Sequence, residues 1–261
     1  MTTDAANTKM SDRPRRGRLL LGLSLCIVVI VTCNATYNGF TLFEWWRDLH
    51  SGVVLSHAST SEKVVALTFD DGPDPTYTPR VLDTLHHYSV HATFFDQGRQ
   101  IQKYPLLVRR TVAEGHCIGN HTYSHPYLTR LTPKAVRNEM EACDRCLKTD
   151  VGIKTALFRS PRGDWNPMVY RQTVQDHKYL VLWTIALEHH DIPTPQAMAQ
   201  RVLQRVRPGD IILMHDGAFV SREATVQALP ILIEGLQKRG YRCVTVPALL
   251  HLPATTVLSR R

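Results

Sequence analysis

Short apolar runs alternate with longer amphipathic segments over most of the chain. The runs are rich in β-branched and aromatic residues, as buried strands are. Seven of them predict strands: VVALTF, VHATFF, HCIGN, TALFR, YLVLWTI, DIILMH and YRCVTV. Between these runs, apolar residues at helical spacing predict helices over 77–88, 102–114, 132–148, 166–177, 195–206 and 222–238.

The alternation of strand and helix predicts the fold class. Consecutive strands joined by helices are parallel, because the helix carries the chain back to the edge where the next strand begins. We therefore expect an α/β fold whose strands form a barrel. Thr132-Pro133 and Thr194-Pro195 support two helix starts, since a capping threonine before proline is typical of a helix N-terminus. In such folds the side chains that carry chemistry lie at the carboxyl ends of the strands.

The N-terminal region has a different pattern. Residues 1–18 carry five Lys or Arg against two Asp, and no charged residue follows until Glu44. The uncharged run is long enough for a membrane span of roughly 20 residues, and its most apolar part also resembles the core of a signal peptide. Basic residues stay in the cytoplasm, so either interpretation exports the rest of the chain. We expect a single-pass anchor in the cell membrane, because the small-residue motif CNA is a weak cleavage site; secretion after cleavage is the alternative.

These patterns divide the chain into five parts. They are a cytoplasmic basic segment (1–18), a membrane anchor or signal segment (19–43), a linker (44–62), a folded domain (63–252) and a C-terminal tail (253–261). The net charge of +8 is unevenly distributed: the short first part is strongly basic and the remainder is only mildly basic. No basic and aromatic residues interleave elsewhere, so we expect no nucleic-acid partner. Cys143 lies in the apolar stripe of a predicted helix, with Cys146 beside it, and no second C-x-x-C motif follows, which favours a core position for Cys143. Oxidation of the pair in an exported domain is the alternative.

Charged and polar side chains follow several of the predicted strands. Asp70 and Asp71 end the first run, and like charges remain adjacent only where a cation, a shared proton or a strong donor offsets their repulsion. His121 and His125, near the end of the third run, have a spacing that places two imidazoles on one face of a helical turn. Two histidines and one carboxylate form a metal site with open positions, as in catalytic centres.

Two further strand ends complete the candidate site. Arg159 ends the fourth run and His215 ends the sixth. A metal bound to Asp71 would offset one of the two adjacent charges, and Arg159 would hold Asp70 ionised as a base.

Four motifs carry a resemblance to a known family. TFDDGP (68–73), HTYSH (121–125), RSPRG (159–163) and LMH (213–215) resemble the motif set of the polysaccharide deacetylases, carbohydrate esterase family 4. The resemblance covers roughly residues 62–250, so the domain at 63–252 is expected to be a polysaccharide deacetylase domain. It implies a distorted seven-stranded β/α barrel and the metal-dependent removal of acetyl groups from N-acetylated sugars, in which water activated by the metal attacks the amide.

The resemblance also implies a role for each matching residue. Asp70 would be the general base, His215 the general acid, and Arg159 the residue that orients Asp70. The remaining expected roles are metal ligands for Asp71, His121 and His125, an oxyanion-binding backbone N–H for Arg162, and substrate contacts for Leu213, Trp183 and His190.

Two departures from the family pattern bear on the mechanism. Arg162 stands where members usually have an aromatic residue, which changes the charge of the rim. In LWTIALEHHDIP (182–193), Ala186 and His189 stand where aspartates are expected, so the usual partner of the acid histidine is missing. We expect one of three residues near that position to pair with His215: Glu188, His189 or Asp191.

The implied cofactor is one divalent metal ion, with zinc the first choice and cobalt, nickel, iron or manganese also compatible with two imidazoles and a carboxylate. The implied substrate is an N-acetylated polysaccharide of the cell envelope, first peptidoglycan and second a chitin-like polymer of N-acetylglucosamine. Two other functions stay open. One is a non-catalytic sugar-binding domain that has lost the partner of its acid, and the other is a related metal-dependent hydrolase of another amide or ester.

Overall fold

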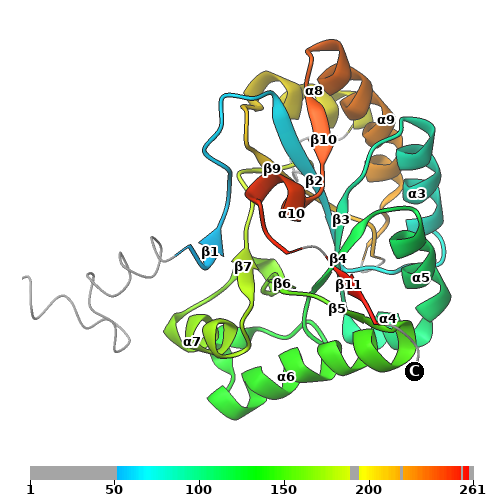
Figure 1. Ribbon diagram of the computed structural model, residues 1–261. Coiled ribbons are helices and arrows are strands. Elements are labelled where there is room, and N and C mark those ends of the chain that lie inside the picture. The colour runs from blue at the N-terminus through cyan, green and yellow to red at the C-terminus, as the bar shows by residue number, and fades with distance from the viewer. Residues whose placement is uncertain (1–51, 189–193, 218–219, 254, 259–261) are drawn as a thin grey trace, which may run out of the picture. The chain divides into compact units, whose positions relative to one another are not determined.

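The structure is a computed structural model that describes residues 52–188, 194–217, 220–253 and 255–258 (Figure 1). The expected basic segment and anchor, and residues 44–51 of the linker, lie outside these ranges. Within the described ranges, no helix combines the length and the apolar character needed to cross a membrane.

A curled sheet of nine strands forms the centre of this part of the chain, and every pair of neighbouring strands in it is parallel. The strand order is β1-β7-β6-β4-β3-β2-β9-β8, and β10 pairs with the first half of β2. This parallel arrangement confirms the predicted α/β class. The strands are β1 (Val54–Leu55), β2 (Val64–Asp70), β3 (Thr93–Asp96), β4 (Cys117–Asn120), β6 (Leu157–Phe158), β7 (Tyr179–Val181), β8 (Ile185–Ala186), β9 (Ile211–His215) and β10 (Arg242–Val244).

The predicted run YLVLWTI is two strands rather than one. Its first half is β7, which pairs with β6, and its second half is β8, which pairs with β9. β7 lies near one end of the strand order and β8 lies at the other end, yet only Leu182–Thr184 separate them in sequence. The chain itself therefore links the two ends of the sheet, which curls the sheet into a half-barrel without a continuous ladder of hydrogen bonds around it.

Helices surround this sheet, and their starts follow the predicted signals. Thr132 and Thr194 accept hydrogen bonds from the backbone N–H groups of Ala135 and Ala197, so both expected caps form. The predicted helix over 102–114 is divided at Tyr104, because Pro105 disfavours helical geometry in the residue before it. The helices are α3 (Thr78–His87), α4 (Gly98–Lys103), α5 (Pro105–Ala113), α6 (Pro133–Cys146), α7 (Pro167–Gln175), α8 (Pro195–Arg205), α9 (Glu223–Lys238) and α10 (Val246–Leu250).

Shorter elements complete the described part of the chain. β5 (Ile153–Lys154) and β11 (Thr256–Val257) form a separate antiparallel pair. Three short helical turns are η1 (Leu128–Arg130), η2 (Leu147–Val151) and η3 (Pro161–Gly163). The η2 turn continues α6 with π-helical geometry.

The central strand β2 is buried along its whole length and divides the core in two. Val65, Leu67 and Phe69 pack in the cluster that includes helices α3, α8 and α9, whereas Val64 and Ala66 pack inside the curl of the sheet. Because side chains alternate along a strand, Asp70 lies on the inner face together with Val64 and Ala66. A carboxylate is thereby placed inside the curl, at the carboxyl end of the strand.

Cys143 and Cys146 are buried in the main hydrophobic cluster, as predicted, and both are free thiols. The Sγ atom of Cys143 donates to the carbonyl oxygen of Asp96, with 3.5 Å between the two atoms. Burial raises the pKa of the Cys143 thiol well above its usual range, so this cysteine is held as a neutral core residue.

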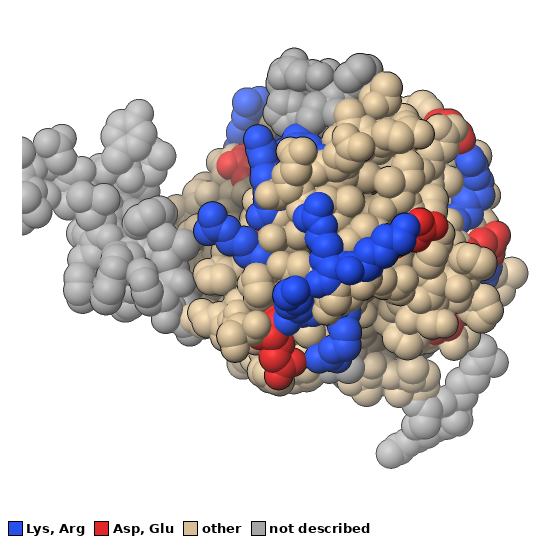
Figure 2. Space-filling view, turned by 90° about the horizontal axis from the view of Figure 1, so that it is seen from above, with Lys and Arg blue, Asp and Glu red and all other residues tan. Residues whose placement is uncertain are grey.

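Cationic side chains gather on the face seen from above in Figure 2, over the ends of α8 and α9 and the start of β10. Helices α8 and α9 both end there, and cations near helix C-termini interact favourably with the helix dipole. The strands β2, β9 and β10 begin at this face, so their carboxyl ends lie at the opposite end of the sheet. The exposed cations here are Lys63, Arg205, Arg207, Lys238, Arg239 and Arg242.

Candidate metal centre and active site

Two adjacent carboxylates end the central strand. Asp70 is the last residue of β2, and Asp71 follows it with a φ of 76°. Aspartate adopts this left-handed geometry more readily than most residues. In a regular strand the two side chains would point to opposite faces, but both reach His121: its Nε2 atom lies 3.8 Å from Asp70 Oδ2 and 3.6 Å from Asp71 Oδ1.

The two histidines do not lie on a helical turn, contrary to the prediction. They belong to an irregular loop after β4, in which Thr122 and His125 have φ angles of 65° and 61°. This backbone turns the second imidazole toward the first, and His125 Nε2 lies 3.2 Å from Asp71 Oδ1. One potential ligand atom from each of Asp71, His121 and His125 lies within 4.8 Å of the others, so these three residues could hold a metal ion.

The protonation of both imidazoles suits metal binding. His121 Nδ1 lies 2.7 Å from the carbonyl oxygen of Arg159, which can only accept a hydrogen bond. The proton of neutral His121 is therefore on Nδ1, and the lone pair of Nε2 faces the two aspartates. Burial, together with the neighbouring His121, lowers the pKa of His125 to about 4, so the His125 ring is neutral at ordinary pH.

Three residues that the sequence did not single out hold Asp71 in place. Gln97 Nε2 donates to Asp71 Oδ1 at 2.9 Å, and Arg222 Nη2 lies 3.5 Å from Asp71 Oδ2. Gly217 packs against the backbone of Asp71 so closely that a Cβ there would lie 2.2 Å from the carbonyl oxygen of Asp71. No local sequence signal distinguishes these three residues from ordinary loop residues.

Asp70 is paired with a fully buried arginine. Arg159 Nη1 lies 2.7 Å from Asp70 Oδ1, and the arginine is 0% exposed. Its other donors bind the carbonyl oxygens of Val181 and Leu182, and its guanidinium lies 4.1 Å from the ring centroid of Phe95. Burial lowers the pKa of Arg159, but the Asp70 carboxylate opposes this change. The arrangement fixes the orientation of the Asp70 side chain, with Oδ2 directed toward His121.

His215 lies beside Asp70 on the neighbouring strand, and its partner is Glu188. The backbone register pairs Asp70 with His215. His215 Nδ1 lies 3.3 Å from Glu188 Oε2, while Glu188 Oε1 accepts hydrogen bonds from the His215 backbone N–H at 3.0 Å and from Thr225 Oγ1 at 2.8 Å. The other two candidate partners, His189 and Asp191, lie outside the described residues, as does His190.

The pKa shifts of His215 and Glu188 both favour the charged form of the side chain. Burial disfavours the charged imidazole, but the Glu188 carboxylate and the nearby Asp70 outweigh burial and raise the pKa of His215. For Glu188, burial is likewise outweighed by His215 and by the hydrogen bond from Thr225, and its pKa is lowered. A protonated His215 beside an ionised Glu188 is therefore favoured.

The remaining predicted contacts surround this centre. Leu213 is buried in β9 two residues before His215, so both side chains leave the strand on the same face. The ring of Trp183 packs on Gly163, where a Cβ would lie 2.6 Å from the ring, and it also lies below the Arg159 guanidinium. Arg162 has a φ of 61°, and its side chain is exposed.

Two more buried carboxyl groups lie near the site and were not predicted. Asp216 directly follows His215, is 0% exposed, and accepts a hydrogen bond from Thr78 Oγ1 at 2.5 Å. Burial and the charge of Asp71 raise the pKa of Asp216 to about 7. Burial also raises the pKa of Asp96 well above its usual range, with a further contribution from Asp216. These raised pKa values favour the protonated forms of Asp216 and Asp96, which limits the negative charge near the two adjacent aspartates.

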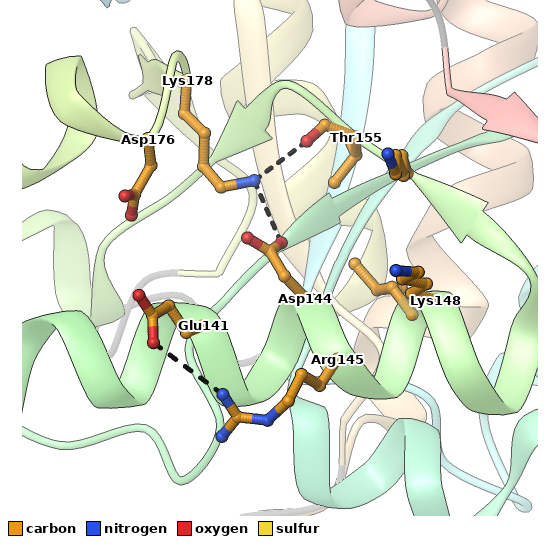
Figure 3. Close-up of a pocket in the computed structure, with 9 residues that line it drawn as sticks. Glu141, Asp144, Arg145, Lys148, Thr155, Asp176 and Lys178 are labelled. Carbon is orange, nitrogen blue, oxygen red and sulfur yellow. Dashed lines mark hydrogen bonds and ion pairs between the residues drawn. The ribbon is translucent and has the colours of Figure 1, made fainter.

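A separate pocket of about 470 Å³ lies between the end of α6 and the start of β7 (Figure 3). Lys178 Nζ donates to Asp144 Oδ1 at 3.0 Å and to the carbonyl oxygen of Thr155 at 2.9 Å. These two acceptors supply hydrogen-bond partners for the Lys178 ammonium group at the centre of the pocket. None of the predicted site residues lines this pocket, so we place the chemistry at the Asp70 and Asp71 end of the sheet.

Comparison with known proteins agrees with this geometry. A sequence model described as polysaccharide deacetylase matches residues 57–182. A peptidoglycan-N-acetylglucosamine deacetylase of Bacillus cereus is 39% identical over 203 residues, which cover 77% of this chain and 94% of that protein. This chain belongs to the polysaccharide deacetylase family.

Other members of the polysaccharide deacetylase family show similar coverage. A chitooligosaccharide deacetylase of Bradyrhizobium is 38% identical over 198 residues, covering 71% of this chain and 90% of that protein. A crystal structure of a peptidoglycan N-acetylglucosamine deacetylase superposes with a TM-score of 0.76 at 31% identity, covering 81% of this chain and 98% of the other. Enzymes with these names are hydrolases of N-acetyl amide bonds.

One structural neighbour in the family is described as inactive. A carbohydrate esterase family 4 pseudoenzyme from Bacillus anthracis superposes with a TM-score of 0.70 at 27% identity and covers 76% of this chain. Membership of the family therefore does not by itself establish activity, which has to be argued from the residues of this chain.

Proposed function

We propose that this protein is a metal-dependent hydrolase that removes N-acetyl groups from a polysaccharide of the cell envelope, with peptidoglycan as the first candidate and a chitin-like polymer of N-acetylglucosamine as the second. The observation that carries the proposal is the convergence of Asp71, His121 and His125, with Asp70 beside them and held by Arg159. The deacetylases among the relatives of this chain support the substrate class.

The donor set fits a divalent metal ion. Asp71, His121 and His125 would hold it through one carboxylate oxygen and two neutral imidazole nitrogens, a set that suits zinc and also cobalt, nickel, iron or manganese. When bound, such a cation polarises the amide carbonyl and lowers the pKa of a nearby water molecule. Three protein ligands leave coordination positions open for both of these groups.

Asp70 acts as the general base. Its Oδ1 is occupied by Arg159 Nη1, whereas Oδ2 faces His121 and the ligand cluster. A carboxylate in this position can accept the proton of the water molecule that attacks the amide. Arg159 orients Asp70, and its fully buried guanidinium offsets the negative charge of the base inside the fold.

His215 acts as the general acid. It stands next to Asp70 across the β2–β9 ladder and is held protonated by Glu188. When the tetrahedral species collapses, His215 gives its proton to the leaving amine, which would otherwise be a poor leaving group. Glu188 is the positioning residue for this histidine, in place of an aspartate in the family register.

The groups around this centre supply the remaining interactions. The backbone N–H of Arg162 would donate to the developing oxyanion, and the buried Leu213 side chain would contact the acetyl methyl group. Trp183 holds the Arg162 turn by packing on Gly163.

We further propose that the segment at 19–43 anchors the protein in the membrane with the catalytic domain outside the cytoplasm, which suits a polymeric substrate of the envelope.

One experiment tests the hydrolytic function. The purified protein is incubated with peptidoglycan and with N-acetylglucosamine oligomers, and released acetate is measured before and after chelation and after metal is returned. We expect release that depends on metal and falls by about a hundredfold to ten thousandfold in Asp70→Asn, the usual contribution of a general base. Asp70→Asn should still bind metal, whereas His121→Ala should not.

The non-catalytic alternative makes a different prediction. The altered 183–191 motif and the structural similarity to a pseudoenzyme favour it over other second candidates. A sugar-binding domain would bind metal and glycan, yet it would release no acetate from either substrate at any pH. That result would overturn the hydrolase proposal and leave the metal centre in place.

A further inference from the structure

Two arginine side chains stack on an exposed aromatic ring beside the candidate active site. The guanidinium of Arg162 lies 3.9 Å from the ring centroid of Tyr127, and that of Arg130 lies 4.5 Å from it. Tyr127 is 44% exposed, and both arginines are exposed as well. Guanidinium groups stack favourably on tyrosine rings, and this contact compensates in part for bringing two positive charges together.

This arginine pair lies next to the proposed metal centre. Tyr127 follows the candidate ligand His125 by two residues, and Arg162 Nη1 donates to the carbonyl oxygen of His125 at 3.4 Å. The backbone N–H of Arg162 is the proposed oxyanion donor. The guanidinium groups therefore border the place where the sugar that carries the N-acetyl group would lie.

The charges of Arg130 and Arg162 are not neutralised by an acidic side chain within the described residues. Other exposed arginines of the same domain do have such partners, as Arg80 has Glu223 at 2.7 Å and Arg242 has Glu62 at 3.1 Å. Stacking on Tyr127 fixes the planes of Arg130 and Arg162 but leaves most of their N–H donors free. A planar fork of free donors matches a carboxylate, which can accept two parallel hydrogen bonds.

We propose that Arg130 and Arg162, held on Tyr127, bind a carboxylate of the glycan on the sugar that is deacetylated or on its neighbour. This proposal rests on the hydrolytic function proposed above and names its preferred substrate class: an acidic N-acetylated glycan rather than a neutral one. The lactyl carboxyl group of a muramic residue is amide-linked where a stem peptide is attached and is a free carboxylate where the peptide has been removed. Peptidoglycan strands without stem peptides therefore have this chemistry on alternate sugars. A chitin-like polymer does not.

Two substrates that differ only in the charge of the lactyl group test the proposal. Glycan strands of peptidoglycan with free lactyl carboxylates are compared with the same strands after methyl esterification, which removes the charge and leaves the sugars unchanged. The measured quantity is the ratio of kcat/KM for the acid strands to that for the ester strands. We expect a ratio above one that falls as salt is added, because partly exposed charge pairs are screened.

Variants of Arg130, Arg162 and Tyr127 test whether these residues cause the preference for acid strands. Arg130→Gln and Arg162→Gln should each lower the acid-to-ester ratio about threefold to fivefold, the size expected of one partly exposed ion pair. Tyr127→Leu, which removes the ring that aligns the two arginines, should lower it as well. Arg205→Gln removes an exposed arginine from the end of α8, at the opposite end of the sheet from the site, and should leave the ratio unchanged.

The test separates this proposal from the proposed function. The Kd of both kinds of strand is also measured in the presence of chelator, where no turnover is expected. If acetate is released but the ratio is one, insensitive to salt, or the same in the Arg130 and Arg162 variants, the arginine stack has only a structural role and the proposal is wrong. If no acetate is released, the hydrolase proposal fails, and the ratio of the two Kd values still decides whether the stack binds carboxylates.

Discussion

Glu188 places its carboxylate Oε2 3.3 Å from Nδ1 of His215, although it stands one position away from the register in which an aspartate was expected. The contact results from the position of β8, which lies at the edge of the sheet and pairs with β9. Ala186 pairs with Leu213, and the Leu187 N–H donates to the Leu213 carbonyl oxygen at 2.8 Å, so the chain leaves β8 directly beside His215. The longer glutamate side chain then reaches the imidazole.

Replacing this carboxylate should shift the pH dependence of activity. Glu188 raises the pKa of His215, and His215 must be protonated to act as an acid. In Glu188→Gln the histidine would therefore lose its proton at a lower pH, and the alkaline limb of kcat/KM should move to lower pH. We also expect kcat to fall by about tenfold to a hundredfold, as judged from acetate release across the pH range.

Two matched variants are the controls for this assignment. His189→Gln and Asp191→Asn remove the other two candidates for the partner of His215, and both should leave the alkaline limb where it is. A shift in either of them, with no shift in Glu188→Gln, would show that the pairing of Glu188 with His215 is not the one that operates in catalysis.

The Asp70–Arg159 pair should stabilise the fold only as a pair. Arg159→Met leaves the Asp70 carboxylate buried without its partner, and removing one member of a buried pair typically costs about 3 to 5 kcal/mol of unfolding free energy. Adding Asp70→Asn to Arg159→Met should restore part of this loss, since the orphaned charge is then absent. Denaturant unfolding of the two single variants and the double variant measures the coupling; strictly additive losses would contradict it.

The close approach of Gly217 to Asp71 should be needed for metal binding. Gly217→Ala would place a Cβ 2.2 Å from the Asp71 carbonyl oxygen, and the backbone of the candidate ligand would have to move. We expect a loss of metal affinity of at least about tenfold, measured by calorimetry, as for other changes that misplace a ligand. Gly152→Ala is the control: its φ is +86°, so the substitution is strained, but nothing lies within 4 Å and metal affinity should not change.

A histidine far from the metal centre should make the fold sensitive to acid. Burial and the neighbouring His91 lower the pKa of His116 to about 4, and its Nδ1 accepts the Ala92 N–H at 3.1 Å. The unfolded chain takes up this proton near pH 6.5, whereas the folded protein does so only near pH 4. Stability is therefore fully present above about pH 6.5 and falls as the pH drops toward 4, by on the order of 3 kcal/mol.

His116→Asn tests this source of acid sensitivity. The asparagine oxygen can still accept the Ala92 N–H, but the side chain does not titrate. Unfolding free energies measured between pH 7 and pH 4.5 in the presence of chelator should therefore fall less steeply in His116→Asn than in the unsubstituted protein. The exposed His86→Asn is the control, and an equal pH slope in His116→Asn and the unsubstituted protein would refute the assignment.

The predicted elements were most accurate where one local signal was sufficient. The threonine and proline pairs at 132–133 and 194–195 marked helix starts correctly, because a cap is formed by residues within one turn. The helix predicted over 102–114 failed where Pro105 interrupts it, although proline is itself a local signal. The run YLVLWTI could not be divided from sequence, since its two halves differ only in which distant strand they pair with.

In the candidate site too, the residues marked by a local sequence signal were predicted and those brought together from distant segments were not. The sequence brought forward Asp70, Asp71, His121 and His125 because they follow strand candidates, and the structure places them together. It misjudged how the histidines converge, since the left-handed backbone at Thr122 and His125 has no sequence signature comparable to glycine. Gln97 and Arg222 went unnoticed because each meets Asp71 from a separate loop.

By itself, the sequence determined the alternation of parallel strands and helices and the type of chemistry at the strand ends, because periodicity, caps and motifs act over a few residues. Only the tertiary structure decided that Glu188, among the three candidates, lies beside His215, that Arg159 is fully buried, and that Arg130 and Arg162 share one tyrosine ring. Apart from Arg130 and Tyr127, these residues come together from distant parts of the chain, and their geometry depends on how the whole sheet curls.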